Sequence, residues 1–450
     1  MAGTISVNLP AVVAGDTTIR EVSFQAEPAT SGWRVEGFRA MLPGRTKLEA
    51  GGLLGTGDGF GFKGNLIVAS TQPSGLANWL GAGIATPALR LLSGAGFSAN
   101  VDLAPGMQRF DALELAVGSS MLKGSASRRT DGERPLVELA LKGDTLDLGM
   151  FAAFGGMFVN GSADLPDLGH DLALTLDAGP VTASGLEADA FGLTARVKED
   201  RADIDRLMVT NLAGASLSAT GSLTDLSLTP SGTVDVSIVS ADGAELISTL
   251  AAQFSGPDWL SLAADRIGAT PDLLSDAQLS FIASTAPEDK DRSWTLSGNA
   301  KAASGSASFT GNWKSGEDLG DADGGWQVTA TQREPLNFLS LAGVDLVPLG
   351  APGPATVELK ANGNPAVSLE LEFAYSAEGT SATFAGTRSN GADGPLLAGK
   401  VSLTSDDLDP YLLATGLALP GTGFGTPVTL QTTMSSSGGS LEMKDIAASV

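Results

Sequence analysis

Apolar and polar residues alternate along most of this chain. In TVDVSIVS (233–240) Val234, Val236 and Ile238 alternate with Thr233, Asp235 and Ser237, and the alternation ends at Val239. The segments PLVELALKG (135–143) and VSLELEFAY (367–375) show the same alternation, with Glu, Lys or Ser between apolar residues. Because successive side chains of a strand point to opposite faces of a sheet, each segment predicts a strand with one apolar and one polar face. Such strands are typical of antiparallel sheets.

A short glycine-flanked phrase recurs five times among these strands. Each copy has a Gly, then small or polar residues around one or two apolar ones, and then a second Gly. Because Gly tolerates turns and close backbone approach, we interpret the two glycines as the limits of one strand in a meander. More strand follows each copy, whereas a phosphate-binding loop would lead into a helix. The copies are PGRTKLEAGGL (43–53), GSSMLKGSA (118–126), GASLSATGSL (214–223), GSASFTGNW (305–313) and GTSATFAGT (379–387).

Apolar residues spaced three and four apart predict a short helix at the end of each group of strands. The most complete signal is DLDPYLLATG (407–416), where we expect Asp409 as the N-cap, Pro410 as the first helical residue and Gly416 at the end. Comparable segments are PSGLANWLG (73–81), LDLGMFAAFGG (146–156), DGAELISTLAAQF (242–254) and EPLNFLSLAG (334–343), with two more near 86–94 and 257–268.

These patterns together predict a mainly β protein, an elongated and repetitive antiparallel sheet with short helices closing each unit. We expect one continuous region over residues 1–450. Strand patterns are present at both ends of the sequence, so we also expect an internal segment of a longer protein. The approximate units are 4–83, 95–156, 170–268, 277–344 and 355–420.

Composition argues against several classes of function. The chain has 51 acidic and 27 basic residues and a net charge of -24, so nucleic acid is an unfavourable partner. It has no Cys, and its single His, His170, has no catalytic partner visible in the sequence. No apolar run approaches the roughly 18 to 20 residues that span a bilayer. We therefore expect no enzymatic activity, no cofactor and no metal.

Several of these segments resemble the AsmA-like family of Gram-negative envelope proteins, relatives of TamB. The resemblance implies a twisted sheet rolled into an open groove that shields phospholipid acyl chains between the inner and outer membranes. It also implies a periplasmic location and a tether to the inner membrane. The family's N-terminal membrane helix and C-terminal end are absent from this sequence, so membrane contacts would lie outside it. The segments are LPGRTKLEAGG (42–52) with LANWLG (76–81), GERPLVELALKGDTLDL (132–148), and LAGASLSATGSL (212–223) with PSGTVDVSIVSADGAELISTL (230–250).

The apolar strand faces are the candidate lipid lining. In this hypothesis they solvate acyl chains, gaining about 0.8 kcal/mol per buried methylene, while the headgroups stay in water. The alternation alone leaves open whether each face contacts lipid or other protein. The candidate residues are Val137, Leu139, Leu141, Val234, Val236, Ile238, Val367, Leu369, Leu371 and Phe373.

A second hypothesis is a structural or adhesive secreted β-array with a dry core and no lipid cargo. The acidic, Gly-rich, Cys-free composition fits both hypotheses, but calcium-binding glycine repeats are missing and a helix closes each unit. Other features have plainer interpretations. We expect His170 at a surface turn, and Glu317, Asp318, Asp321 and Asp323 in a solvated turn rather than a calcium site. The residues Trp79, Trp259, Trp294, Trp313 and Trp326 suit either a core or a groove lining.

Overall fold

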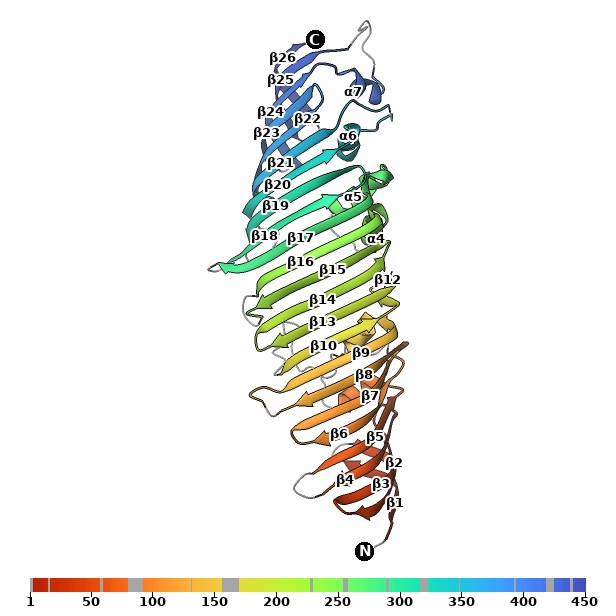
Figure 1. Ribbon diagram of the computed structural model, residues 1–450. Helices are drawn as coiled ribbons and strands as arrows, with labels where there is room; N and C mark the ends of the chain where they lie inside the picture. Colours follow the sequence, from red (N-terminus) through yellow and green to blue (C-terminus); the bar gives the residue numbers. More distant parts are fainter. Residues whose placement is uncertain are drawn as a thin grey trace. The chain divides into compact units, whose positions relative to one another are not determined.

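The computed structural model shows a mainly β chain that divides into two compact units. The first unit comprises residues 1–212 and 222–228, and the second comprises 213–221 and 229–450. In Figure 1 the first runs from red to yellow-green and the second from green to blue. The structure describes residues 3–450 except 15–16, 57–59, 80–91, 131, 156–169, 227–229, 254–257, 289–290, 316–322, 348, 392–393, 418–424 and 438–439.

The first unit consists of a sheet and two described helices. Its helices are α1 (Pro73–Trp79) and α3 (Leu148–Gly155). Its strands are β1 (Ile5–Ala14), β2 (Thr17–Ala29), β3 (Gly32–Leu42), β4 (Thr46–Gly55), β5 (Gly61–Ser70), β6 (Ala95–Ala104), β7 (Met107–Val117), β8 (Ser120–Arg129), β9 (Leu136–Asp147), β10 (Asp171–Ala178), β11 (Val181–Ala183), β12 (Leu186–Ala188), β13 (Ala190–Lys198) and β14 (Arg201–Leu212).

Strands β1 to β9 pair in chain order, each antiparallel to the next. Strand β10 instead lies parallel to β9, with Leu174 opposite Leu139. Strand β11 also pairs parallel with β9, at Leu146 and Asp147. Neighbouring parallel strands need a long crossover connection, and the connection from β9 to β10 contains α3. The expectation of a wholly antiparallel sheet is therefore wrong at β9.

The core of the first unit lies on the apolar face of β6 to β10. Leu122, Leu141 and Leu146 are at most 2% exposed, and Phe151 and Phe154 of α3 pack against this cluster. Several strand pairs of this unit contain register shifts, for example between Phe110 and Leu113 in the pairing of β7 with β8. The first unit thus buries part of its sheet against its own helix.

Among its described residues the second unit has eleven strands from β16 onward, and β15 (Ala215–Thr224) lies at the division between the units. Its helices are α4 (Gly243–Gln253), α5 (Asp258–Gly268), the 3-10 helix η1 (Pro271–Leu274), α6 (Leu336–Ala342) and α7 (Asp409–Ala414). The strands are β16 (Ser231–Asp242), β17 (Ser275–Glu288), β18 (Asp291–Lys301), β19 (Gly305–Ser315), β20 (Asp323–Gln332), β21 (Ala355–Asn364), β22 (Ser368–Ala377), β23 (Thr380–Gly391), β24 (Gly394–Ser405), β25 (Val428–Ser437) and β26 (Ser440–Ser449).

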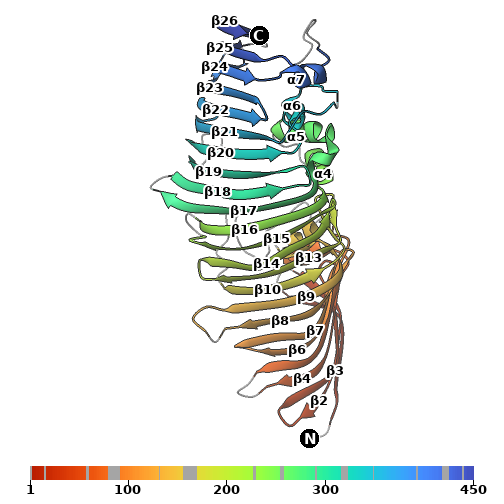
Figure 2. The same ribbon diagram turned by 45° about the horizontal axis from the view of Figure 1, so that its top comes forward.

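Strands β16 to β26 form an antiparallel meander, which Figure 2 shows as a ladder of strands. From β16 to β25 the described pairs keep one register without a shift. A slip of one residue would exchange the two faces of a strand, so the unbroken register keeps every strand's apolar side chains on the same side.

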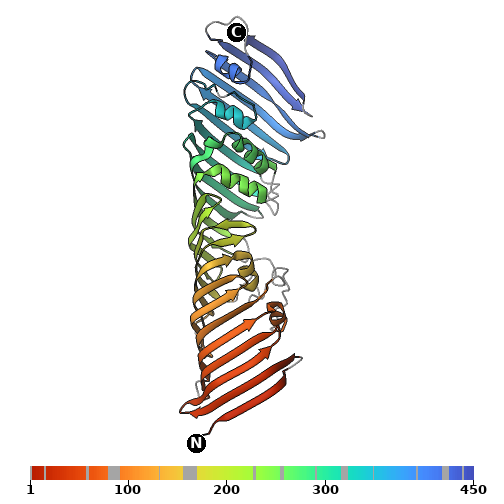
Figure 3. The same ribbon diagram turned by 90° about the vertical axis from the view of Figure 1, so that its right-hand side faces the viewer.

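The helices of the second unit share one margin of its sheet. Helices α4 and α5 follow β16, α6 follows β20 and α7 follows β24, so four strands separate successive helical connections. An even number of antiparallel strands returns the chain to the margin it left, and Figures 1 and 3 show α4 to α7 at the same strand ends. We call this side the helix margin. The hairpin margin is the opposite side, where the turn at residues 365–367 joins β21 to β22.

The glycine-flanked phrase is a turn followed by a strand that contains the second Gly. Gly44, Gly118, Gly214 and Gly379 lie in turns with φ between 58° and 75°. The second glycines lie inside β4, β8, β15, β19 and β23, so the interpretation that they delimit strands is wrong. The turns are anchored by strand ends near the helices: Ser70 donates to the Gly44 carbonyl at 3.0 Å, and Ser240 donates to that of Gly214 at 3.1 Å. The phrase is therefore a repeated scaffold element.

Helix α7 begins differently from the sequence-based expectation. Asp409 is its first residue, the N-cap position is Leu408, and no side chain caps the helix there. Instead Asp407 Oδ1 accepts hydrogen bonds from the backbone N–H of Asp409 at 3.0 Å and of Thr426 at 3.1 Å. The prediction of Asp409 as N-cap is thus wrong, because the preceding Asp forms the local side-chain turn. The helix expected near 86–94 lies largely outside the described residues.

The two tyrosines of the chain join α7 to the sheet. Tyr375 of β22 is 9% exposed, its hydroxyl lies 3.0 Å from that of Tyr411, and Phe338 of α6 packs edge-on against it. Burial, together with the Tyr411 hydrogen bond, raises the pKa of Tyr375 well above its usual value. Because the pKa of Tyr375 is higher in the folded chain than in the unfolded chain, its protonated hydroxyl stabilises the fold below the usual tyrosine pKa of about 10. This contribution to stability is lost as the pH rises beyond that value.

We therefore expect the second unit to lose thermal stability above about pH 10, the usual tyrosine pKa. Replacing Tyr411 by Phe should cost about 1 kcal/mol at neutral pH, the typical net value of a hydrogen bond. Thermal unfolding followed by circular dichroism between pH 8 and 11 would measure both effects. An identical melting temperature for Tyr411→Phe and the unaltered chain at neutral pH would contradict this prediction.

Candidate apolar binding face

Side chains that lie opposite one another on successive strands form rows across the sheet of the second unit. Three adjacent rows on one face contain only apolar residues, Gly and Tyr375 from β16 to β24, and we call them the apolar face. The central row is Val236, Phe281, Gly298, Phe309, Val328, Leu359, Phe373, Phe384 and Val401. The row toward the hairpin margin is Val234, Ala283, Leu296, Gly311, Trp326, Ala361, Leu371, Gly386 and Gly399, and the row toward the helix margin is Ile238, Leu279, Ala300, Ala307, Ala330, Val357, Tyr375, Ala382 and Leu403.

The apolar face keeps contact with solvent. Apart from Gly311 and Tyr375, every residue of the three rows is partly or fully exposed, and Leu359 near the middle of the central row is 39% exposed. In the first unit, by contrast, Leu122 and Leu141 are 0% and 1% exposed. The described residues therefore place no complete second layer over the apolar face of the second unit.

The opposite face of the same sheet is polar. Thr233 and Ser284 hydrogen-bond across β16 and β17 at 3.0 Å, and Lys360 faces Glu372 at 3.9 Å across β21 and β22. Ser, Thr, Asn and Gln fill most of the remaining positions on this face between β17 and β20. The sheet thus presents one wettable side and one apolar side, as the alternation of the sequence indicates.

Glycines on the apolar face make room for aromatic rings. A Cβ atom at Gly298 would lie 2.5 Å from Cζ of Phe309 and 2.7 Å from Cβ of Phe281. At Gly311 it would lie 2.8 Å from Cε3 of Trp326. The rings therefore cover backbone that has no side chain, an arrangement that compensates for Gly in a strand. Aromatic residues thus lie next to glycines on neighbouring strands, which keeps this face closely packed along the sheet.

Three tryptophans stack on adjacent strands toward the hairpin margin. The rings of Trp294 and Trp313 are 6.1 Å apart and nearly parallel, and those of Trp313 and Trp326 are 4.6 Å apart. We call these three residues the tryptophan ladder. Arg292 lies two residues beyond Trp294 on β18, and alternation places it on the same face. Arg388 of β23 also lies on this face, opposite Leu369.

A pocket of about 270 Å³ lies where α4 and η1 meet the apolar face at the helix margin. Leu246 and Ile247 of α4 and Leu274 of η1 line it on the helix side. On the sheet side it is lined by the row toward the helix margin, with Ile238, Leu279, Ala300, Ala307 and Ala330, and it is bordered by the polar residues Ser240, Gln278, Lys301, Ser306 and Gln332. The pocket continues the apolar face beneath the helices.

The structure assembles six of the ten predicted lining residues on one face. These are Val234, Val236, Ile238, Leu369, Leu371 and Phe373, of which Leu369 belongs to the next row toward the hairpin margin. Val367 differs, because it lies in the turn before β22 and is 66% exposed. In the first unit Leu141 is buried in the core and Leu139 packs against that core, so they contact protein; Val137 lies partly buried on β9.

Other members of the apolar face were missing from the sequence-based set. Phe281, Phe309 and Phe384 occupy its central row. The sequence contains a local pattern that indicates Phe309, since Phe309, Gly311 and Trp313 follow one another at intervals of two residues in β19. Only the pairing register shows that these strands lie side by side.

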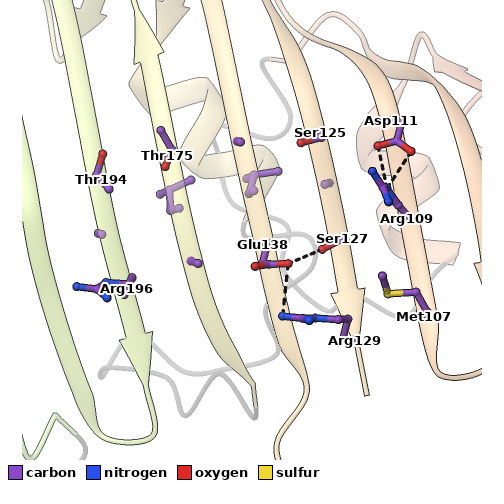
Figure 4. Close-up of a pocket in the computed structure, with 16 residues that line it drawn as sticks. Met107, Arg109, Asp111, Ser125, Ser127, Arg129, Glu138, Thr175, Thr194 and Arg196 are labelled. Atoms are coloured by element: carbon purple, nitrogen blue, oxygen red, sulfur yellow. Dashed lines mark hydrogen bonds and ion pairs between the residues drawn. The ribbon is translucent and has the colours of Figure 1, made fainter. Parts of the chain in front are cut away.

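The polar face of the first unit carries a separate hollow of about 480 Å³, drawn in Figure 4. Arg109 donates to Asp111 at 2.9 Å, and Ser127 donates to Glu138 at 3.0 Å, with Arg129 3.7 Å from the same carboxylate. A two-pronged contact with Asp205 raises the pKa of Arg196. These arginines already have carboxylate partners, so the hollow is a poor anion site and contains no nucleophile paired with a base among its described lining residues.

The remaining candidate groups do not form a reactive site within the described part of the chain. No group of three or more His, Asp or Glu residues could hold a metal ion among the residues described. His170 lies directly before β10 and is partly buried. Asp323 is the first residue of β20, whereas Glu317, Asp318 and Asp321 lie outside the described residues. None of the described helices is long and apolar enough to cross a bilayer.

Comparison with known proteins gives no relative: no family model, no curated protein and no solved structure matches the chain. The functional argument therefore depends on the two faces of the sheet and their chemistry.

Proposed function

We propose that this protein is a non-enzymatic lipid-transfer segment whose apolar face lines a groove and shields phospholipid acyl chains. The observation that carries the proposal is the solvent-exposed apolar face of the second unit, opposed by a polar face on the same strands. Ordinary monomers rarely expose apolar patches beyond roughly 300 to 600 Å². A large apolar surface in water is unfavourable by about 25 cal/mol per Å², so a ligand that covers it binds with a corresponding gain.

The dimensions of the face suit several acyl chains. Its central row crosses nine strands, and at about 4.8 Å between neighbouring strands it extends roughly 38 Å. The polar face keeps the unit soluble on its other side. Because the lining consists of many similar contacts, no single residue is essential, which suits transfer better than selective capture.

We further propose, from the resemblance to the AsmA-like family, that this segment acts in the periplasm of a Gram-negative cell. There it would carry phospholipid between the inner and outer membranes and support outer-membrane biogenesis. Tethering to the inner membrane and contact with both membranes would depend on segments outside this chain. The net charge of -24 favours zwitterionic over anionic headgroups.

The alternative function, a structural or adhesive array with a dry core, has support from the first unit. Its sheet packs Leu122, Leu141 and Leu146 against protein, which is how such an array would hold together. In the second unit the large side chains of the central row remain partly exposed. The two hypotheses therefore differ in what covers the apolar face of the second unit.

We expect the 450-residue chain, purified from a Gram-negative host without detergent, to retain several phospholipids per molecule. Solvent extraction followed by phosphate analysis and mass spectrometry would count and identify them. Buffer without protein, processed through the same columns, gives the background phospholipid level. Phospholipid at that background level in a folded chain would overturn the proposal and favour the dry array.

A further inference from the structure

We infer that acyl chains lie along the strands of the second unit, with their methyl ends in the pocket under α4 and their headgroups at the tryptophan ladder. This orientation depends on the proposed lipid function and adds a direction to it. It follows from three observations: the apolar pocket at one margin, aromatic and cationic side chains at the other, and the length of strand between them.

The pocket at the helix margin suits the end of a hydrocarbon chain. Its helix-side lining includes Leu246, Ile247 and Leu274, and its sheet-side lining includes Ala300 and Ala307. The volume of about 270 Å³ corresponds to roughly nine groups of the size of a water molecule, each occupying about 30 Å³. Most of the lining is apolar or Gly, and the polar residues Ser240, Gln278, Lys301, Ser306 and Gln332 also border the pocket. Burying a charged phosphate against the apolar side chains is unfavourable, so the pocket suits hydrocarbon better than a headgroup.

The opposite margin offers groups that suit the polar end of a lipid. Tryptophan combines an apolar ring with an N–H donor, and it is enriched where hydrocarbon meets headgroups. Trp294, Trp313 and Trp326 form a continuous stack of this kind. Arg292, on the same face of β18 and two residues closer to the hairpin margin, has the guanidinium geometry that binds phosphate.

The separation of the two ends matches an acyl chain. Ala300, which lines the pocket, and Trp294 are six residues apart on β18, a distance of about 20 Å at roughly 3.3 Å per residue. The hydrocarbon core of a bilayer is about 30 Å thick, so one leaflet contributes roughly 15 Å. A membrane phospholipid with its chain end in the pocket would therefore place its glycerol and phosphate close to the ladder and Arg292.

Photocrosslinking of the full chain tests this orientation. The protein would be loaded with either of two phosphatidylcholines, one with a diazirine at the acyl terminus and one with a diazirine near the acyl carbonyl. We expect terminal crosslinks in peptides containing Leu246, Ile247 or Leu274, and carbonyl-proximal crosslinks in those containing Trp294 or Trp313. Equal or reversed distributions would overturn the orientation while leaving lipid binding intact. Failure of the folded protein to retain either lipid would instead overturn the proposed function.

Filling the pocket provides a second test with a matched control. Ala307→Phe places a ring in the pocket, whereas Ser308→Phe places the same ring on the polar face one residue later. We expect Ala307→Phe to abolish terminal crosslinks to α4 and to shift the bound lipids toward shorter chains, with phospholipid still present. Ser308→Phe should change neither. If Ala307→Phe fails to fold, Ile247→Trp fills the pocket from the helix. Unchanged crosslinks and chain lengths in a folded pocket variant would refute the inference.

Discussion

Lipid passage along the second unit is expected to stop when Val236 and Leu369 are both replaced by Asp. Both residues lie on the apolar side of the sheet, on β16 and β22, and both are partly exposed. Placing an Asp in hydrocarbon costs roughly 3 kcal/mol, which offsets the gain from about four buried methylenes at 0.8 kcal/mol each. A lipid that moves from strand to strand across the tryptophan ladder therefore meets one added charge on β16 and another on β22. Transfer of a fluorescent phospholipid between vesicles, together with phospholipid extracted per chain, measures the effect.

The matched control for this pair is Ser237→Asp with Ser368→Asp. These serines are the next residue after Val236 and the residue before Leu369, so their side chains lie on the polar face and the added charge is the same. The control should transfer lipid as the unaltered chain does. Far-ultraviolet circular dichroism and thermal unfolding establish that both variants are folded. Equal transfer by the two folded variants would show that the apolar face is not the conduit.

Local strand structure could be predicted from the sequence because alternation is a property of neighbouring residues. Val234, Val236 and Ile238 lie on one face of β16, with Asp235 exposed on the other. Helices also occur within segments whose apolar spacing indicated them, such as α4 and α5. In each case the evidence lies within about a dozen residues, and tertiary contacts did not override it.

What each apolar face contacts could not be predicted in the same way. Leu141 and Val236 have the same alternating surroundings, yet Leu141 is 1% exposed within the first unit's core and Val236 remains partly exposed. The difference arises from the crossover through α3, which also makes β10 parallel to β9. Val367 continues the alternation of β22 but lies in a turn, where Asn364 and Val367 share a backbone hydrogen bond. Such outcomes depend on distant segments.

The glycines illustrate the same limit. Gly311 and Gly386 were interpreted as the ends of strands, because Gly often breaks a strand. Both are interior residues of their strands, next to the rings of Trp326 and Phe384. The pairing that brings Gly311 beside Trp326 joins β19 to β20. Only this register distinguishes a glycine that ends a strand from one that accommodates a ring.

Gly386→Ala is expected to destabilise the second unit although Ala is the better strand residue. Its Cβ would press on the carbonyl oxygen of Ala398 and lie 2.6 Å from Cα of Gly399 and 2.8 Å from Cζ of Phe384. Two of these neighbours are backbone, so the strands must separate or the ring must leave the sheet. Overpacking of this kind costs about 1 to 3 kcal/mol, and a unit of this size loses roughly 2 to 4 °C in melting temperature per kcal/mol.

The same substitution at Gly37 should have the opposite sign. A Cβ at Gly37 of β3 would meet nothing within 4 Å, so the main effect of Gly37→Ala is to reduce the conformational freedom of the unfolded chain. That effect stabilises a protein by about 0.4 to 1 kcal/mol where the backbone is compatible. Differential scanning calorimetry of both variants compares the two signs. A melting temperature of Gly386→Ala at or above that of the unaltered chain would mean that the ring of Phe384 does not lie over the glycines. The side chains of the apolar face would then be packed less closely than the contacts of Gly386 indicate.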